Sequence, residues 1–148
     1  MRIEFYSDDE TQIEELPKRV RAILGVPEEL LEDDVILSKD FLIQADSYVN
    51  KQIQEYEGLN ESLIEIAYIY YVCYLLCLGM HSRLPKQMEN LSTKTVLQTI
   101  DWDSKALECL DKSNEIILDT ISEIEDENIY NTSATLSNET TYPNTTNM

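Results

Sequence analysis

Glycine and proline are scarce in this chain, with three glycines and four prolines in 148 residues. An all-β fold uses these residues at its many tight turns, so their scarcity argues against such a fold. A few long helices joined by short links fit the composition better. The length predicts one domain that is large enough to bury a hydrophobic core.

Basic residues are also few, with 11 lysines and arginines against 29 aspartates and glutamates and a formal net charge of −18. Proteins bind nucleic acid mainly by placing clustered Lys and Arg on the phosphates, so the charge balance excludes this mode of binding. The acidic residues have two interpretations. They form a solvated surface that keeps the protein soluble, or they repel DNA that has to slide past without sticking.

Histidine occurs once, at His81, which leaves Ser–His and Cys–His mechanisms almost without a base. We find no Gly-rich phosphate loop and no nucleophile motif. Cys73, Cys77 and His81 recur at every fourth residue, but a helix separates the outer two by roughly 12 Å, too far to share one metal ion. We expect these cysteines and Cys109 to be small core residues in a reducing compartment. The sequence therefore predicts no enzymatic activity, no cofactor and no metal site.

The longest stretch without charge lies between Glu65 and Arg83. Apolar and aromatic residues occupy every side of the helix predicted at 61–80, so other helices or lipid must cover it all round. The uncharged run is shorter than the roughly 20 apolar residues that span a bilayer. Its four central tyrosines also need hydrogen-bond partners. We favour a core helix and keep a membrane span as the alternative.

Two further long helices are predicted on either side of this central helix. The first covers 38–57, with Ser38 as its N-cap and Gly58 as its left-handed terminating residue, and the short link to the Asn60 cap makes it an antiparallel neighbour. The last begins at an Asp103 cap and buries the apolar positions from Leu107 to Ile124.

The N-terminal region predicts shorter elements. Arg2 to Tyr6 alternates like a short strand. Pro17 is expected to start a separate short helix, because proline inside a continuous helix clashes with the preceding turn. Gly25 is expected to end that helix.

The segment before the last helix, STKTVLQTI at 92–100, has the composition of a strand. Within the chain its only candidate partner is the segment from Arg2 to Tyr6. An unpaired strand edge invites pairing with another chain. We therefore predict that this loop contacts a neighbouring subunit through Thr93, Thr95, Val96, Leu97, Ile100 and Trp102.

Apolar periodicity stops at Glu125, and residues 128–148 are rich in Asn, Thr and Ser. Such a segment buries too little apolar surface to offset the entropy lost on ordering. It is either a disordered end without a role or an extended arm that becomes ordered on a partner. The anchors of such an arm would be Ile129, Tyr130, Leu136, Tyr142 and Pro143.

Together these elements predict a mainly α fold. We expect a small helical bundle of three long helices and one or two short ones, with a strand-like inter-helix loop and an extended C-terminal arm. The helical domain would span 1–127, including an acidic N-terminal segment at 1–16, and the arm would span 128–148.

The order of these elements resembles the head–tail connector (adaptor) proteins of tailed double-stranded DNA bacteriophages. The resemblance is one of pattern and covers residues 17–124. The matching parts are PKRVRAILGV, LSKDFLIQADSYVNKQI, IAYIYYVCYLLCLGM, STKTVLQTIDWD and SKALECLDKSNEIILDTI. Members of that family often carry a Gly-rich loop where this chain has no glycine between Ser92 and Asp103.

The resemblance implies a structural virion protein at the head–tail junction, made in the host cytoplasm. Its subunits would form a ring, dodecameric in the virion, beneath the portal protein, with the inter-helix loop between subunits and the C-terminal arm on the portal. A further connector or tail protein would follow on the tail side. Genomic DNA would pass through an acidic channel without specific binding, and no membrane would be involved. The alternatives are a small phage membrane protein such as a holin, or an acidic helical regulatory protein.

Overall fold

The computed structural model describes residues 1–5, 10–82 and 100–141, and the side chains of this part up to residue 127. Its helices are α1 (Glu10–Leu24), α2 (Asp33–Ile36), α3 (Lys39–Ile53), α4 (Glu61–Leu78) and α7 (Trp102–Thr141). The described residues contain no strand. The prediction of a mainly α bundle is therefore confirmed.

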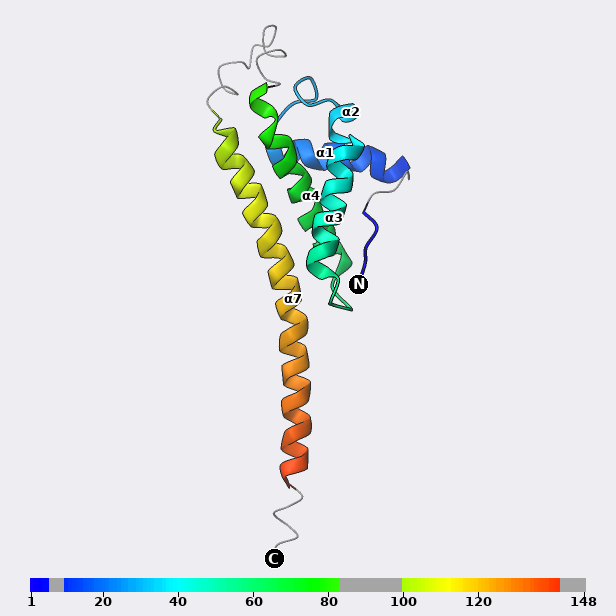
Figure 1. Cartoon of the computed structure of the whole chain (residues 1–148), viewed down its shortest axis with the longest axis vertical. Helices are drawn as coiled ribbons and strands as arrows, with labels where there is room; N and C mark the ends of the chain where they lie inside the picture. The colour runs from blue at the N-terminus through cyan, green and yellow to red at the C-terminus, as the bar shows by residue number, and fades with distance from the viewer. Residues whose placement is uncertain (6–9, 83–99, 142–148) are drawn as a thin grey trace, which may run out of the picture.

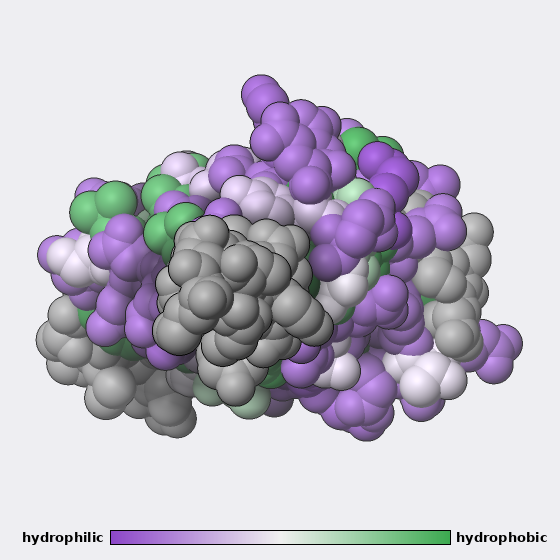
Figure 2. Space-filling model, turned by 90° about the horizontal axis from the view of Figure 1, so that it is seen from below, coloured by the Kyte–Doolittle hydropathy of each residue, from purple (hydrophilic) through white to green (hydrophobic). Residues whose placement is uncertain are grey.

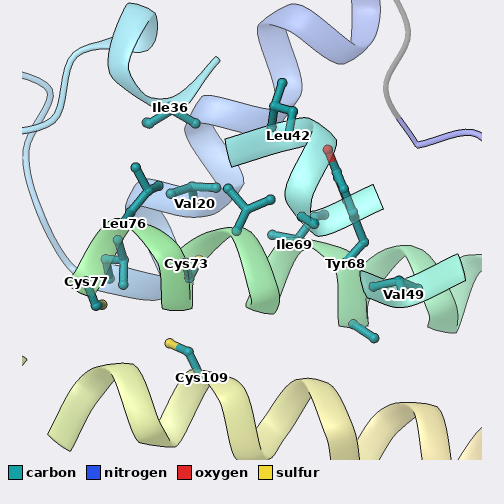
Figure 3. Close-up of a cluster of buried hydrophobic side chains, with 14 of the residues drawn as sticks. Val20, Ile36, Leu42, Val49, Tyr68, Ile69, Cys73, Leu76, Cys77 and Cys109 are labelled. Atoms are coloured by element: carbon teal, nitrogen blue, oxygen red, sulfur yellow. The ribbon is translucent and has the colours of Figure 1, made fainter. Parts of the chain in front are cut away.

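The central helix α4 is the core of the bundle. It packs against α1, α3 and α7, and Figure 1 shows α7 along one side of it and α1 with α3 on the other. Val72 and Leu76 are fully buried, and the close-up in Figure 3 shows Leu76 pointing toward Val20 and Ile36. This cover on several sides explains why α4 has no polar face.

By length and composition alone, α4 is also apolar enough to cross a membrane, with a mean hydropathy of 1.5. The core helix of a globular bundle passes the same test, so the hydropathy does not separate the two possibilities. The packing of α4 against three other helices agrees with the core interpretation.

Local signals place several helix ends where the sequence predicts them. The Asn60 side chain accepts hydrogen bonds from the backbone N–H groups of Ser62 and Leu63, at 3.1 and 3.4 Å, and so caps α4. Gly25 follows α1 with φ of 68°, a conformation that L-residues rarely adopt. The bounds differ elsewhere: α3 ends at Ile53 instead of 57.

The start of α7 is one such difference. Asp101, not Asp103, accepts the hydrogen bond from the Ser104 backbone N–H, at 3.1 Å. The Asp101 carboxylate also accepts from the Ser104 hydroxyl at 2.8 Å. These hydrogen bonds, with the hydroxyl contributing most, lower the pKa of Asp101. Both aspartates fit the capping preference, and the sequence alone does not say which of them lies at the helix start.

Pro17 lies inside α1 and does not begin a separate helix, so that prediction is wrong. Proline in a helix interior loses one backbone hydrogen bond and costs about 3 kcal/mol. Pro17 is itself buried, as are Val20 and Leu24 farther along α1, and α1 packs against α4. Burial of this apolar face offsets the local cost, so tertiary packing overrides the proline signal.

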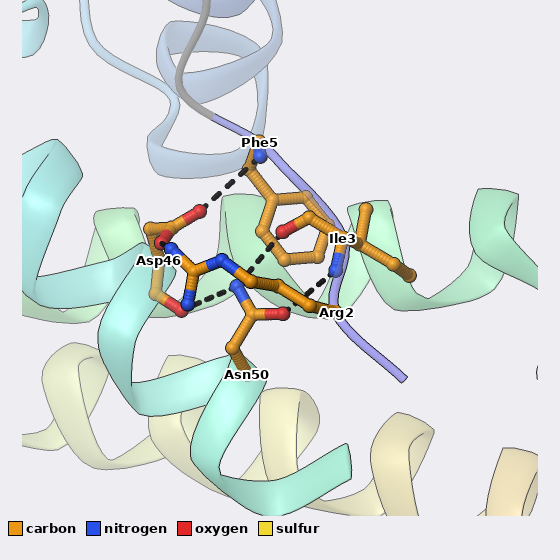
Figure 4. Close-up of polar contacts among 5 residues, drawn as sticks. All are labelled: Arg2, Ile3, Phe5, Asp46 and Asn50. Atoms are coloured by element: carbon orange, nitrogen blue, oxygen red, sulfur yellow. Dashed lines mark hydrogen bonds and ion pairs between the residues drawn. The ribbon is translucent and has the colours of Figure 1, made fainter. Parts of the chain in front are cut away.

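The predicted strand from Arg2 to Tyr6 is not present in the described residues 1–5. Instead, the Asn50 side chain of α3 accepts from the Ile3 backbone N–H and donates to the Ile3 carbonyl, both at 2.8 Å. Asp46 accepts from the Phe5 backbone N–H at 3.2 Å and pairs with Arg2 at 3.2 Å (Figure 4). Side chains of α3 thus satisfy backbone groups that a second strand would otherwise pair.

The long helix α7 has 40 residues, against 18 in α4. Among its residues up to 127, Ile121 is the last buried one, and Ile124 is partly buried against the core. Residues 125–141 continue past the bundle as a helix (Figure 1), roughly 25 Å long at about 1.5 Å per residue. We call these residues the projecting helix.

The extended conformation predicted for the arm is therefore wrong at 128–141, and residues 142–148 lie outside the described residues. Starting a helix is costly, but adding residues to an existing helix is not. The packed part of α7 supplies the nucleus, and the sequence has no glycine or proline between Trp102 and Thr141. The described part of this helix reaches Thr141. The proposed boundary at 127/128 thus falls inside a continuous helix.

Candidate functional site

The predicted subunit-contact loop lies mostly outside the described residues. This applies to Thr93, Thr95, Val96 and Leu97. Ile100 is described and packs partly buried against the core. Trp102 is the first residue of α7 and only 1% exposed. It is therefore a core residue of its own chain, with almost no surface left for a neighbour.

The predicted portal-binding residues are divided in the same way. Ile129, Tyr130 and Leu136 belong to the projecting helix, whose backbone is described. Tyr142 and Pro143 lie outside the described residues. The first three residues are thus carried on a helix that has left its own bundle, which is a suitable geometry for contact with another molecule.

A second candidate surface lies where α3 and α7 flank α4. Tyr71, Tyr74, Leu75 and Leu78 of α4 follow the i, i+3, i+4, i+7 spacing of one helix face, and all four keep some exposure. Phe41 and Tyr48 are seven residues apart on α3, and so are Leu107 and Asn114 on α7. Residues at this spacing lie on the same face of a helix. We call this surface the tyrosine face; its members are Phe41, Tyr48, Tyr71, Tyr74, Leu75, Leu78 and Leu107.

Contacts between the rings join the three helices at this face. Tyr48 stacks on Tyr71 with ring centroids 4.0 Å apart, and Tyr71 meets Tyr74 at 5.3 Å. The Tyr48 hydroxyl donates to Asn114 Oδ1 of α7 at 2.5 Å. Burial, followed by the neighbouring phenols of Tyr74 and Tyr48, raises the pKa of Tyr71. The Tyr71 ring is thus held in place, and its hydroxyl stays protonated at physiological pH.

The tyrosine face is apolar but not fully covered. Leu78 is 54% exposed and Leu107 is 60% exposed. Most of the surface visible from the end where α7 leaves the bundle is hydrophilic, with separate hydrophobic patches (Figure 2). Contiguous apolar surface on a soluble domain commonly marks a binding site. In a chain with a net charge of −18, an uncharged face is also where another acidic copy meets least repulsion.

A pocket of about 440 Å³ opens between the N-terminal segment, α1 and α4. Phe5 and Tyr68 stack at 4.6 Å and line it together with Ile69. Its polar lining includes four glutamates and Arg19, whose guanidinium lies 3.4 Å from the Glu65 carboxylate. The described lining residues combine an apolar wall with carboxylates and one guanidinium.

Chemistry-bearing groups are sparse in the described part of the chain. It holds no group of three His, Cys, Asp or Glu residues arranged for a metal ion. His81, the only histidine in the sequence, faces Asp103 at 3.4 Å on the exposed end of the bundle. No family model, curated protein or solved structure matches this chain. The candidate sites therefore rest on their own geometry.

The sequence reasoning missed the tyrosine face. The four tyrosines of the central helix were interpreted as core residues that reach a polar margin, and Tyr68 does lie in the core. Tyr71 and Tyr74 are partly exposed because α3 and α7 leave this side of α4 incompletely covered. The i, i+3, i+4, i+7 spacing was visible in the sequence, but an all-apolar helix has such a stripe on every side.

Proposed function

We propose that this protein is a structural assembly subunit, and that its assembly is the connector ring between the capsid portal and the tail of a double-stranded DNA phage. The observation that carries the proposal is the projecting helix, which extends α7 beyond every other helix of the bundle (Figure 1). A helix without cover from its own chain gains stability when a partner covers it. This is the form expected of a subunit that joins two bodies.

Two further features support the assembly role. The tyrosine face offers uncharged surface for contact between copies, next to the start of the inter-helix loop. The net charge of −18 suits a channel through which DNA moves without binding. The phage identity itself comes from the resemblance in the order of elements, and the tyrosine face and projecting helix suggest which surfaces such a ring would use.

Mixing the purified protein with the portal ring of the same phage tests the proposal. We expect electron microscopy to show a ring of this protein beneath the portal, with twelve copies, and we expect the two proteins to elute together. Deleting 128–148 should weaken portal binding, mainly by faster dissociation. A protein that neither binds the portal nor joins a larger particle contradicts the proposal.

The inter-helix loop is tested separately. Replacing both Val96 and Leu97 by Lys should weaken ring formation, because it brings charge into a predicted subunit contact. Replacing Glu115 by Gln, at an exposed position of α7, is the control and should leave assembly unchanged. If the doubly substituted protein forms portal-bound rings as well as the parent does, the loop is not the subunit contact.

The alternative of a small phage membrane protein is favoured only by the composition of α4. The two functions differ in a simple measurement. A membrane protein partitions into detergent and sediments with membranes, whereas a connector subunit stays in the aqueous phase and binds the portal. An acidic regulatory protein would do neither.

A further inference from the structure

Three thiols meet between α4 and α7. Cys73 and Cys77 lie one turn apart on α4, and Cys109 comes from α7. All three are buried and reduced. Figure 3 shows Cys109 pointing across the helix interface toward the turn that carries Cys73 and Cys77. The three thiols are close enough to shift one another's pKa. Residues that are more than thirty positions apart in sequence thus share one thiol cluster.

Cys109 also lines a surface pocket. The pocket has a volume of about 270 Å³ and is bounded by Ile23 of α1, Tyr70 of α4, and Lys105, Glu108, Cys109 and Lys112 of α7. Lys105 pairs with Glu108 at 3.4 Å and Lys112 with Glu115 at 3.8 Å, so each keeps a glutamate beside it. Neither Cys73 nor Cys77 lines the pocket. Of the three cysteines, Cys109 is therefore the one that a small molecule in this pocket would contact.

We propose that Cys109 is a modification site for a small hydroperoxide, and that its oxidation forms a disulfide joining α7 to Cys73 or Cys77 of α4. The pocket gives the oxidant its access, and the thiol cluster gives the oxidised sulfur a partner. This site is independent of the proposed assembly function, which does not use the thiols.

The chemistry takes place in two steps. In the first, the Cys109 thiolate attacks one peroxide oxygen, the O–O bond breaks, and the leaving hydroxide or alkoxide takes a proton to become water or an alcohol. The sulfur loses two electrons and becomes a sulfenic acid. In the second, an α4 thiol attacks that sulfur, the S–O bond breaks, and hydroxide leaves with the thiol proton as water. In sum, two thiols and one hydroperoxide give one disulfide, the water or alcohol released in the first step, and the water released in the second.

The surroundings divide the roles among the three sulfurs. Hydrogen bonds from the Cys73 and Cys77 thiols, and then the nearby Lys105 ammonium, lower the pKa of Cys109 against the opposing effect of its burial. The same hydrogen bonds, together with burial, raise the pKa of Cys73 and of Cys77. A thiolate in this cluster therefore resides on Cys109.

The test treats the folded, full-length protein with hydrogen peroxide and measures its intact mass and its free thiols. We expect the loss of two hydrogens and of two of the three thiols, and peptide mapping should link Cys109 to Cys73 or Cys77. Cys109→Ala should keep both remaining thiols. The double variant Cys73→Ala, Cys77→Ala should stop at a sulfenic acid on Cys109, which a carbon nucleophile such as dimedone traps.

The unsubstituted protein alone can overturn the proposal, so the result does not depend on whether a variant folds. Three intact thiols in the folded chain, under peroxide that oxidises them in urea, would show that the pocket gives no access to Cys109. A disulfide between two chains would show that the cluster does not form the predicted bond. Oxidation of Cys109→Ala at the rate of the parent would show that Cys109 is not the thiol that reacts with peroxide. Lys39→Gln, on the exposed surface of α3, is the charge-matched control for Lys105→Gln, and only the latter should slow the loss of thiols.

Discussion

The two parts of α7 share one continuous backbone but have different surroundings. Residues 102–124 pack along α4, bury Cys109, Ile117 and Ile121, and donate a hydrogen bond from the Ser113 hydroxyl to the Ala67 carbonyl at 2.7 Å. Residues 125–141 leave the bundle, and the last three with described side chains, Glu125, Asp126 and Glu127, are all exposed. The first part is held by tertiary burial, the second by helix propagation from the first.

This difference separates two kinds of role within one element. The packed part carries the stability of the bundle, since its side chains lie in the core. We expect the projecting helix to add little stability, because its backbone runs past the end of the bundle (Figure 1). Substitutions there are free to serve a partner without unfolding the domain, as expected of a binding element.

The largest difference between the packed part of α7 and the projecting helix is expected when an apolar residue of each is replaced by a charged one. Ile117→Asp should cost several kcal/mol, since it buries an unpaired carboxylate, against a total stability of about 5–15 kcal/mol. Leu136→Asp should leave the free energy of unfolding within about 0.5 kcal/mol of the parent. Urea denaturation followed by circular dichroism measures both. Equal losses would mean that the projecting helix is also packed against the bundle.

A proline in each part gives the next largest effect. Glu115→Pro removes a backbone hydrogen bond inside the packed part and should destabilise the protein by about 3 kcal/mol or more. Asn131→Pro should break only the projecting helix, with an unchanged thermal midpoint and reduced helical ellipticity. Both residues are polar, and Glu115 is exposed. The loss of either side chain should therefore matter little, and the two variants compare the effect of proline on the backbone. A lowered midpoint for Asn131→Pro would contradict the independence of the projecting helix.

The buried hydroxyl of Ser113 predicts a smaller difference. Ser113→Ala removes its hydrogen bond to the Ala67 carbonyl and should cost about 0.5–1.5 kcal/mol. Ser133→Ala, in the projecting helix, should change stability by only a few tenths of a kcal/mol, because the backbone has left the bundle at that point. Thermal melting of both variants beside the parent decides the matter. No loss for Ser113→Ala would mean that the carbonyl is satisfied by its own helix alone.

The smallest expected change in stability follows deletion of 128–148. The thermal midpoint should shift by no more than a degree or two, because the backbone of α7 has already left the bundle before residue 128 (Figure 1). Total helical ellipticity should fall all the same, because residues up to Thr141 are helical. A midpoint that drops by many degrees would show that the bundle depends on the projecting helix.

The fold class and much of the core could be predicted because their signals are local or repeat along one helix. The stretch without charge between Glu65 and Arg83 identified α4, and the Asn60 cap located its start. Of the candidate site, the residues Ile129, Tyr130 and Leu136 were predicted as anchors, but their helical backbone was not. The composition of 128–148 disfavoured an ordered structure. The packed part of α7 supplies the helix nucleus for the residues that follow it, and the composition of those residues does not reveal this.

The sequence by itself determined that the chain forms a few long helices, that α4 is apolar on every side, and that Asn60 and Gly25 mark helix ends. Each of these depends on residues within a few positions of one another, so the energy that decides them is local. Only the tertiary structure decided that α1 continues through Pro17, that Asn50 holds Ile3, that Trp102 lies in the core, and that three distant cysteines meet. These outcomes depend on which helices pack together, and burial between distant residues outweighs local preferences of up to about 3 kcal/mol.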